Sequence, residues 1–260
     1  MAVRSNDARF PRGCLIATFV AALLLCVLFY GFIVPGVWPI LAHGRAQERY
    51  RDCDHNMMFV AQALVRYEDV HKGLPAATTT GTVSAPPLSW RVALLPFLLL
   101  GDRSDVATYD RHEAWDGPHN TTLHGLDLWY YHCPADTDPR TNASYLAVIG
   151  PQTAFPGAKA VRPAVMTGGS SNAIVIVETT ASGIHWMQPK DLSVSEALRG
   201  VGAEPGPSIS SRHFQDGGAS TDGAHALYAD GHVRWLGATT DANVLRKLLD
   251  INASQPVSDR

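Results

Sequence analysis

An uncharged run over Cys14–Val34 constrains this chain more than any other feature of its sequence, because it contains 21 residues and no charged side chain. A helix of this length rises about 30 Å, which matches the hydrocarbon core of a bilayer. A secretory signal peptide usually has an apolar core of only about 7–15 residues, followed by small residues at a cleavage site. Here Pro35 and Trp38 follow instead. We therefore expect a retained single-span anchor over residues 14–41, with the lipid bilayer as its partner.

The charges beside this run do not decide its orientation in the membrane. Three arginines precede the run and three follow it closely, so the positive-inside rule gives no preference. The long segment that follows is large enough to be a folded domain, and such a domain can be exported whole. We therefore expect a cytoplasmic N-terminus over residues 1–13 and an extracytoplasmic domain over residues 42–260, held at the cell membrane.

Composition excludes several classes of protein. The formal net charge is −3, so there is no bulk positive charge for nucleic-acid binding, and we expect no nucleic acid as partner. Charged residues make up 17% of the chain and hydrophobic residues 46%, which argues against a disordered tail. The length of 260 residues suits one medium domain or two small ones.

Two of the four cysteines, Cys53 and Cys133, lie outside the predicted anchor. An even pair in an oxidising compartment is a candidate for one disulfide, and the alternative is two buried free thiols. Because the chain has no Cys-x-x-Cys, we expect neither a zinc ribbon nor a thioredoxin motif.

The spacing of apolar residues predicts a long helix over residues 46–71 and a short amphipathic helix over residues 240–251, capped by Thr240 or Asp241. Between them the pattern predicts short strands over 128–132, 145–149, 173–177, 225–229 and 232–236. It also predicts a short helix over 90–100 and irregular loops over 76–87 and 102–126. A long helix, then antiparallel strands, then a short helix is the order of an α+β domain.

Asp230-Gly231 lies between two of these β-rich runs, and Asp-Gly in that position is a strong hairpin signal. A two-residue turn needs φ > 0 at both of its residues and fixes the register of the strands. We therefore predict that residues 225–229 pair with 232–236 across this turn, with His225 and His232 facing solvent beside it.

Imidazoles and carboxylates gather near this hairpin, and they suit zinc or a similar ion. His213, Asp230 and His232 form the weak candidate set for a metal. Turn geometry alone explains Asp230, so we expect a structural role for this region, with no metal and no cofactor. The chain contains neither Gly-x-Ser-x-Gly nor a phosphate-binding Gly-x-x-x-x-Gly-Lys motif, and we expect no catalytic residue.

Short motifs in a fixed order are similar to those of one bacterial family. They are Arg51-Asp52-Cys53-Asp54-His55-Asn56-Met57, Ser89-Trp90-Arg91-Val92, Trp115-Asp116-Gly117-Pro118-His119-Asn120, Cys133-Pro134, Gly169-Ser170-Ser171-Asn172 leading to Glu178, Trp186 to Asp191, and His213 with Asp230-Gly231. Together they resemble the prepilin-like proteins of domain-of-unknown-function family 1559 (DUF1559). Any one motif is weak, whereas the ordered set covers nearly the whole chain.

The resemblance implies a pilin- or pseudopilin-like fold, in which a long N-terminal helix, half in the membrane and half outside it, packs on an antiparallel sheet. It also implies other pilin-like subunits as partners and a prepilin-cleavage-like position at Gly13-Cys14. The chain departs from the family there, since Thr18 stands where pilin-type helices carry Glu. It departs again near its end, where sixteen residues instead of nine separate His213 from Asp230.

These observations favour a non-enzymatic, membrane-anchored pseudopilin-like protein that belongs to a pilus-like or secretion assembly. An anchored ligand-binding module and a metal-dependent hydrolase are the alternatives.

Overall fold

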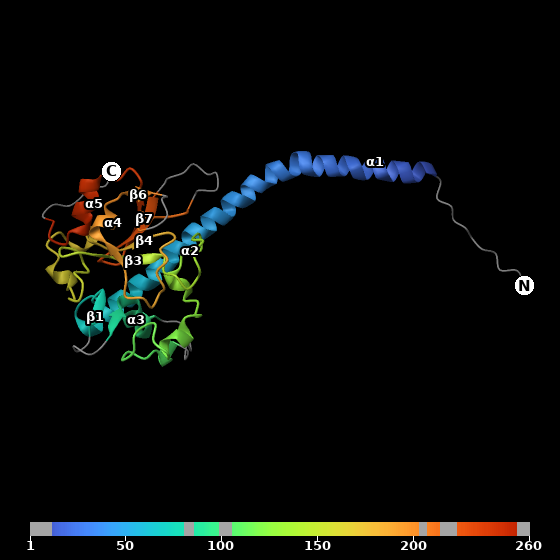
Figure 1. Cartoon of the computed structure of the whole chain (residues 1–260). Helices are drawn as coiled ribbons and strands as arrows, with labels where there is room; N and C mark the ends of the chain where they lie inside the picture. Colours follow the sequence, from blue (N-terminus) through green and yellow to red (C-terminus); the bar gives the residue numbers. More distant parts are fainter. Residues whose placement is uncertain (1–11, 81–85, 99–105, 203–206, 214–222, 254–260) are drawn as a thin grey trace, which may run out of the picture. The chain divides into compact units, whose positions relative to one another are not determined.

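The computed structural model describes residues 12–80, 86–98, 106–202, 207–213 and 223–253. The chain divides into two compact units, residues 1–46 and 47–260. Its first elements are α1 (Arg12–Leu28), a π-helical turn (Phe29–Ile33) and α2 (Val34–His71), coloured from blue to cyan in Figure 1. Within them, the stretch Ala17–Val37 is long and apolar enough to cross a membrane, and none of its most apolar window is buried.

A five-stranded sheet with the order β5-β3-β4-β8-β9 organises the second unit. The strands are β3 (Tyr145–Ile149), β4 (Ile174–Glu178), β5 (Leu192–Ser193), β8 (Gly223–Tyr228) and β9 (Val233–Gly237). Four of them form an antiparallel set, and β5 pairs with β3 in parallel. The predicted α+β class is confirmed, but the sheet is mixed at one edge instead of wholly antiparallel.

Side chains of β3 alternate between two hydrophobic cores, one on each face of the sheet. Tyr145 and Ala147 belong to the core that contains Met57 and other residues of α2. Leu146 and Val148 belong to the opposite core, which contains the apolar side chains of α5 (Ala242–Leu249). The inner strands β3, β4 and β8 are therefore buried on both faces, whereas the edge strand β9 is largely only partly buried.

Helix α5 begins where the sequence predicts a cap. The carboxylate of Asp241 accepts hydrogen bonds from the backbone N–H groups of Asn243 (2.8 Å) and Val244 (3.3 Å), which lack partners inside the helix. The buried face of α5 consists of Leu245, Leu248 and Leu249.

Shorter elements complete the described part of the second unit. They are β1 (Thr78–Thr80), β2 (Pro87–Ser89), α3 (Trp90–Leu94), α4 (Val194–Ala197), β6 (Val201–Gly202), β7 (Ile209–Ser210) and 3₁₀ turns at Leu95–Phe97, Val106–Thr108, Asn120–Leu123, Trp129–Tyr131, Pro163–Val165 and Ser170–Asn172. The predicted loop over 76–87 thus contains β1 and the first residue of β2, which pair in antiparallel fashion.

The strand predicted over 128–132 is wrong, because this segment forms the 3₁₀ turn Trp129–Tyr131. The side-chain amide of Asn56 donates hydrogen bonds to the carbonyl oxygens of Trp129 (2.9 Å) and His132 (3.0 Å). A side chain of α2 thus satisfies acceptors that a neighbouring strand would otherwise use. The aromatic residues Tyr130 and Tyr131 favour a strand by their local propensity, but here they belong to a 3₁₀ turn and are buried in the core.

The hairpin between β8 and β9 forms, but its turn differs from the prediction. Gly231 N–H donates to the carbonyl of Tyr228, and Tyr228 N–H donates to the carbonyl of His232, both at 2.9 Å. Gly231 has φ +92°, whereas Asp230 is not among the described residues with positive φ. These contacts describe a three-residue loop with a glycine bulge, so the register differs by one residue from that of a two-residue turn.

Candidate functional site

Cys53 of α2 and Cys133, the candidate pair of the sequence, are joined by a disulfide with a Cα–Cα distance of 5.1 Å. Both residues are completely buried. The bond ties α2 to the segment that follows the turn Trp129–Tyr131 and spans a sequence separation of 80 residues. Closing so long a loop restricts the unfolded chain, which stabilises the fold by roughly 4 kcal/mol on a chain-entropy account.

A buried carboxylate lies between two imidazoles beside this disulfide. Oε2 of Glu178, the last residue of β4, accepts a hydrogen bond from the backbone N–H of His225 (3.1 Å) and lies 2.8 Å from Nδ1 of the same residue. Its Oε1 accepts from Oγ of Ser211 (3.0 Å) and lies 3.4 Å from Nε2 of His213. That Nε2 is 3.2 Å from Sγ of Cys133. A continuous series of polar contacts therefore leads from the disulfide to β8.

The charge state of Glu178 follows from these contacts. Complete burial raises the pKa of the carboxyl, but hydrogen bonds and charge from His213 and His225 outweigh burial and lower its pKa from 4.5 to about 2. Glu178 is therefore ionised at neutral pH inside the protein, where an uncompensated charge is costly. The two imidazoles and the hydroxyl of Ser211 provide the compensation.

Two aromatic rings cover the imidazoles. The ring centroid of Tyr50, from α2, lies 4.6 Å from that of His225 and 5.6 Å from that of His213. The indole of Trp235, from β9, lies 4.9 Å from His225. Gly223 permits this arrangement, because a Cβ there would lie 2.5 Å from Nε1 of Trp235. The His–Glu–His cluster is thus shielded from water by residues of two elements.

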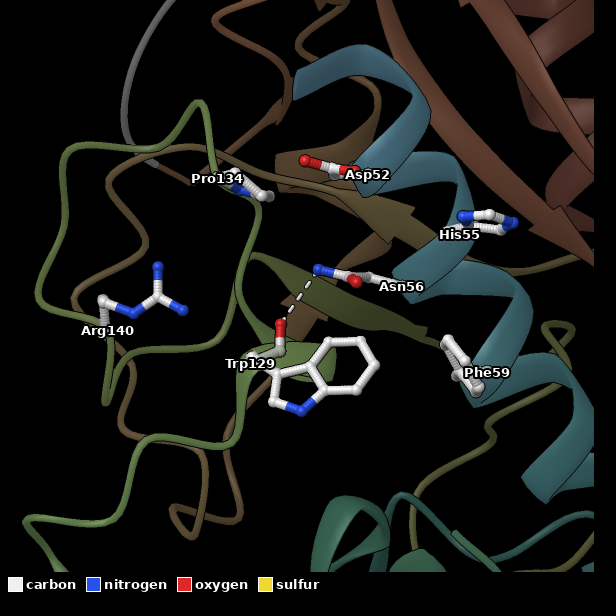
Figure 2. A pocket seen from close by; sticks show the side chains of 7 residues that line it. All are labelled: Asp52, His55, Asn56, Phe59, Trp129, Pro134 and Arg140. Atoms are coloured by element: carbon white, nitrogen blue, oxygen red, sulfur yellow. Dashed lines mark hydrogen bonds between the residues drawn. The ribbon is translucent and has the colours of Figure 1, made fainter. Parts of the chain in front are cut away.

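A pocket of about 330 Å³ is lined in part by Asp52 and Pro134. These two residues are sequence neighbours of Cys53 and Cys133. Figure 2 shows the side chains that line it: Asp52, His55, Asn56, Phe59, Trp129, Pro134 and Arg140. The rings of Phe59 and Trp129 meet edge to face, with centroids 5.2 Å apart. The pocket therefore combines an aromatic wall with charged groups of both signs.

The model of a family described as "protein of unknown function (DUF1559)" matches residues 43–221. The chain belongs to the DUF1559 family. No curated protein and no solved structure matches it. The match to the DUF1559 model includes both cysteines, Glu178 and His213, and ends before Asp230-Gly231.

Two DUF1559-like motifs, about a hundred residues apart, meet in the core. Nε1 of Trp90 donates to Oδ1 of Asp191 (3.0 Å), and Nε of Arg91 donates to the carbonyl of Trp186 (3.1 Å). Trp90, Arg91 and Trp186 are all buried. These contacts join α3 to the segment from Trp186 to Asp191 inside the core.

A third DUF1559-like motif is held in a compact, hydrogen-bonded conformation within the loop that the sequence predicts as irregular. The buried side chain of Asn120 donates to the carbonyl oxygens of Asp110 (2.9 Å) and Ala114 (3.0 Å). Trp115 stacks on the imidazole of His124, with centroids 5.2 Å apart. Asp116 is exposed. This motif, too, has a structural explanation.

The three residues that the sequence offers as weak metal candidates, His213, Asp230 and His232, do not form one group in the structure. His213 lies in the buried cluster, whereas Asp230 of the hairpin loop pairs with His232, the residue after the loop, and both side chains are about one third exposed. The prediction that His225 faces solvent is wrong: it is buried, because β8 is covered on both faces and the imidazole points to Glu178. His232 is also partly covered, since its ring stacks on Tyr228.

The cleavage-like position at Gly13-Cys14 lies at the start of α1. Nothing about the side chain of Cys14 is described, and residues 1–11 lie outside the described residues. This position resembles a prepilin-cleavage site in sequence only, and the sequence does not require processing there.

Sequence reasoning missed the partners of His213. Glu178 appeared only as the end of a motif, although a Glu that closes the apolar run Ile174–Val177 is itself a signal of a buried, paired carboxylate. Tyr50 and Ser211 carry no comparable signal, because a Tyr in a helix and a Ser in a loop are common.

Proposed function

We propose that this DUF1559 chain is a membrane-anchored, extracytoplasmic, pseudopilin-like protein that works without catalysis, as a subunit or accessory of a pilus-like or secretion assembly. The observation that carries the proposal is the stretch Ala17–Val37, which is long and apolar enough to cross a membrane and whose most apolar window is not buried. Such a surface requires a lipid environment or other apolar helices.

The exposed side chains of this stretch suit both environments. They include Phe19, Leu23, Leu24, Leu25, Val27 and Leu28, each at least half exposed. Helices in a bilayer associate through close packing of such surfaces. Pilin-like subunits that assemble through their N-terminal helices would use the same residues.

The buried disulfide supports an extracytoplasmic site for the second unit. Structural disulfides form and persist in oxidising compartments and are rare in the cytosol. Cys53 and Cys133 are both inaccessible to solvent, so their bond belongs to the core of the unit. With the anchor preceding it, this unit would lie on the outer side of the cytoplasmic membrane.

A non-catalytic role is supported by how the buried charges are used. Arg91 and Asp191 neutralise each other, and Glu178 is held by two imidazoles. Each of these groups is oriented by further hydrogen bonds within the core. In this proposal they stabilise the domain, and the exposed anchor makes the functional contacts.

Topology and assembly are tested together in cells that express the full chain with a C-terminal epitope. We expect the epitope to be digested by protease added to spheroplasts and protected in inverted membrane vesicles. We also expect formaldehyde cross-linking at native expression level to give a ladder of bands at multiples of the mass of the chain.

The matched control replaces residues 14–41 by an unrelated single-span anchor of equal length. This chimera should stay in the membrane and lose the ladder. Protection of the epitope in spheroplasts would overturn the topology, and a monomer as the sole cross-linked species would overturn the assembly role.

The pocket in Figure 2 favours a second candidate, an anchored ligand-binding module. Its aromatic wall and its charges of both signs suit a small zwitterion with a flat apolar part, such as an aromatic amino acid. Aromatic amino acids should then raise the Tm of the detergent-solubilised protein, and Trp129→Ala should abolish the shift. The control variant Trp115→Ala, outside the pocket, should keep it.

A further inference from the structure

Four potential metal ligands meet around the disulfide. One donor atom from each of Cys53, Cys133, Glu178 and His213 lies within 4.8 Å of the other three, and all four residues are buried. While the disulfide is intact, its sulfurs are not thiolates and cannot serve as strong ligands. Breaking the bond would turn the same group into a Cys₂-His-Glu set.

We propose that reduction of the Cys53–Cys133 disulfide converts this cluster into a binding site for one Zn²⁺ ion. The proposal goes beyond the assembly role above, because it gives the buried core a second, metal-bound state.

The distances fit tetrahedral zinc. Zn–S bonds of about 2.3 Å and Zn–N or Zn–O bonds of about 2.0–2.1 Å place neighbouring ligand atoms roughly 3.3–3.7 Å apart. Nε2 of His213 already lies 3.2 Å from Sγ of Cys133 and 3.4 Å from Oε1 of Glu178. The Cα atoms of the two cysteines are 5.1 Å apart, so rotation of the side chains alone can let both thiolates face one ion.

The surroundings of Glu178 are suited to a ligand. Oγ of Ser211 donates to Oε1, the oxygen nearest to His213, and fixes its direction. Nδ1 of His225 lies 2.8 Å from the other carboxylate oxygen, Oε2 of Glu178. Partners of this kind orient the ligands in known metal sites and typically affect affinity by about 10–100-fold.

The ligand types select the metal. Two thiolates, an imidazole and a carboxylate are all ligand types that zinc accepts, whereas calcium and magnesium require oxygen ligands. Two thiolates and one carboxylate around Zn²⁺ leave one negative charge in the core. Hydrogen bonds from Ser211 and His225 to Glu178 reduce its cost.

The conversion balances with a dithiol as reductant. One equivalent of dithiol transfers two electrons and two protons to the protein, which breaks the S–S bond and gives two thiols, and the dithiol becomes a cyclic disulfide. Zn²⁺ then displaces both thiol protons into solution and binds the two thiolates. In the laboratory a trialkylphosphine performs the reduction and, with water, becomes its oxide.

The test uses Co²⁺ as a spectroscopic substitute for Zn²⁺ on the full chain in detergent. After phosphine reduction, we expect one equivalent of Co²⁺ to give the visible bands of a tetrahedral ion and thiolate-to-cobalt absorption in the near ultraviolet. Zn²⁺ should bleach both. The oxidised protein should give neither, and equal binding by the oxidised and reduced forms would overturn the proposal.

Variants separate the proposed ligands from bystanders. His213→Ala should weaken Co²⁺ binding by more than 100-fold, and His225→Ala by about 10–100-fold. His232→Ala should leave binding unchanged, since His232 follows the hairpin loop and its imidazole pairs with Asp230. Unchanged affinity in His213→Ala would overturn the proposal.

Loss of the disulfide can unfold the protein, so near-ultraviolet circular dichroism is recorded in every sample. If the reduced apo form is folded, Co²⁺ should bind directly. If it is unfolded, Co²⁺ or Zn²⁺ should restore the folded spectrum in wild type but not in Cys53→Ser/Cys133→Ser. A reduced protein that stays unfolded with metal present would contradict the proposal.

Discussion

The guanidinium of Arg91 and the carboxylate of Asp191 form an ion pair of 2.7 Å in which neither side chain is exposed. Nη2 of Arg91 also donates to the carbonyl oxygens of Gln188 (3.0 Å) and Lys190 (2.8 Å). Oδ1 of Asp191 accepts a further bond from the backbone N–H of Ala147 in β3 (2.9 Å). One ion pair therefore connects α3, the loop before β5 and the inner strand β3.

Removal of either charge should destabilise the domain strongly, because the remaining charge would be buried without a partner. We expect Arg91→Met and Asp191→Asn each to lower the free energy of unfolding by about 3–5 kcal/mol. Denaturant unfolding monitored by tryptophan fluorescence measures the loss. As a control, Arg140→Ala breaks the exposed pair with Asp127 and should cost less than about 1 kcal/mol. Equal effects in the two pairs would contradict this account.

Glu178 should make stability depend on pH. Its pKa in the folded state is about 2, below the ordinary 4.5, so its contribution is fully present above pH 4.5 and is lost as pH falls toward 2. We expect Glu178→Gln to lower the free energy of unfolding on the order of 3 kcal/mol at pH 7. The difference from wild type should shrink between pH 4.5 and pH 3.

Urea unfolding of both proteins at several pH values checks this prediction. Glu48→Gln, at an exposed position of α2, is the control and should stay within about 0.5 kcal/mol of wild type at neutral pH. A constant difference between Glu178→Gln and wild type from pH 7 to pH 3 would show that the carboxylate charge contributes nothing.

Gly231 should be sensitive to backbone strain and not to crowding. A Cβ at this position meets no atom closer than Cγ2 of Val65 at 4.0 Å, but φ is +92°. We expect Gly231→Val to lower stability by about 1–3 kcal/mol. Gly231→Asn should cost less, because Asn tolerates positive φ better. Thermal unfolding compares them, and a silent Gly231→Val would refute the hairpin geometry.

The parts of the fold that follow from local patterns were predictable. The apolar spacing over residues 46–71 predicted the end of α2 at His71, and the β-rich run 145–149 coincides with β3. Such patterns can be recognised within one segment, because the spacing of apolar residues reflects which face of the helix or strand is buried. The strand predicted at 128–132 failed because a remote side chain, Asn56, takes its backbone acceptors.

The candidate site depends on contacts between distant segments, which single motifs do not show. His213 and Glu178 are 35 residues apart in sequence, and Cys133 is 80 residues from His213. The hairpin turn was predicted one residue too short, because Asp-Gly fits both a two-residue turn and a bulged three-residue loop. Local composition does not distinguish them.

The disulfide should contribute more to stability than any surface feature of the domain. We expect Cys53→Ala/Cys133→Ala to lower the free energy of unfolding by roughly 4 kcal/mol in guanidinium. Cys26→Ser, which changes an exposed cysteine of α1, should have no such effect. Peptide mapping without reductant should recover Cys53 linked to Cys133. Recovery of both thiols in alkylated form from the denatured protein would refute the bond.

The central claim is that the N-terminal apolar helix is retained as an anchor, and the mass and N-terminal sequence of the mature protein test it most directly. The account predicts that the chain purified from the membrane fraction begins at or before Cys14 and therefore contains the whole stretch Ala17–Val37. A mature chain that begins near Ala42 and is released from the membrane would contradict it, because the protein would then be a free secreted domain.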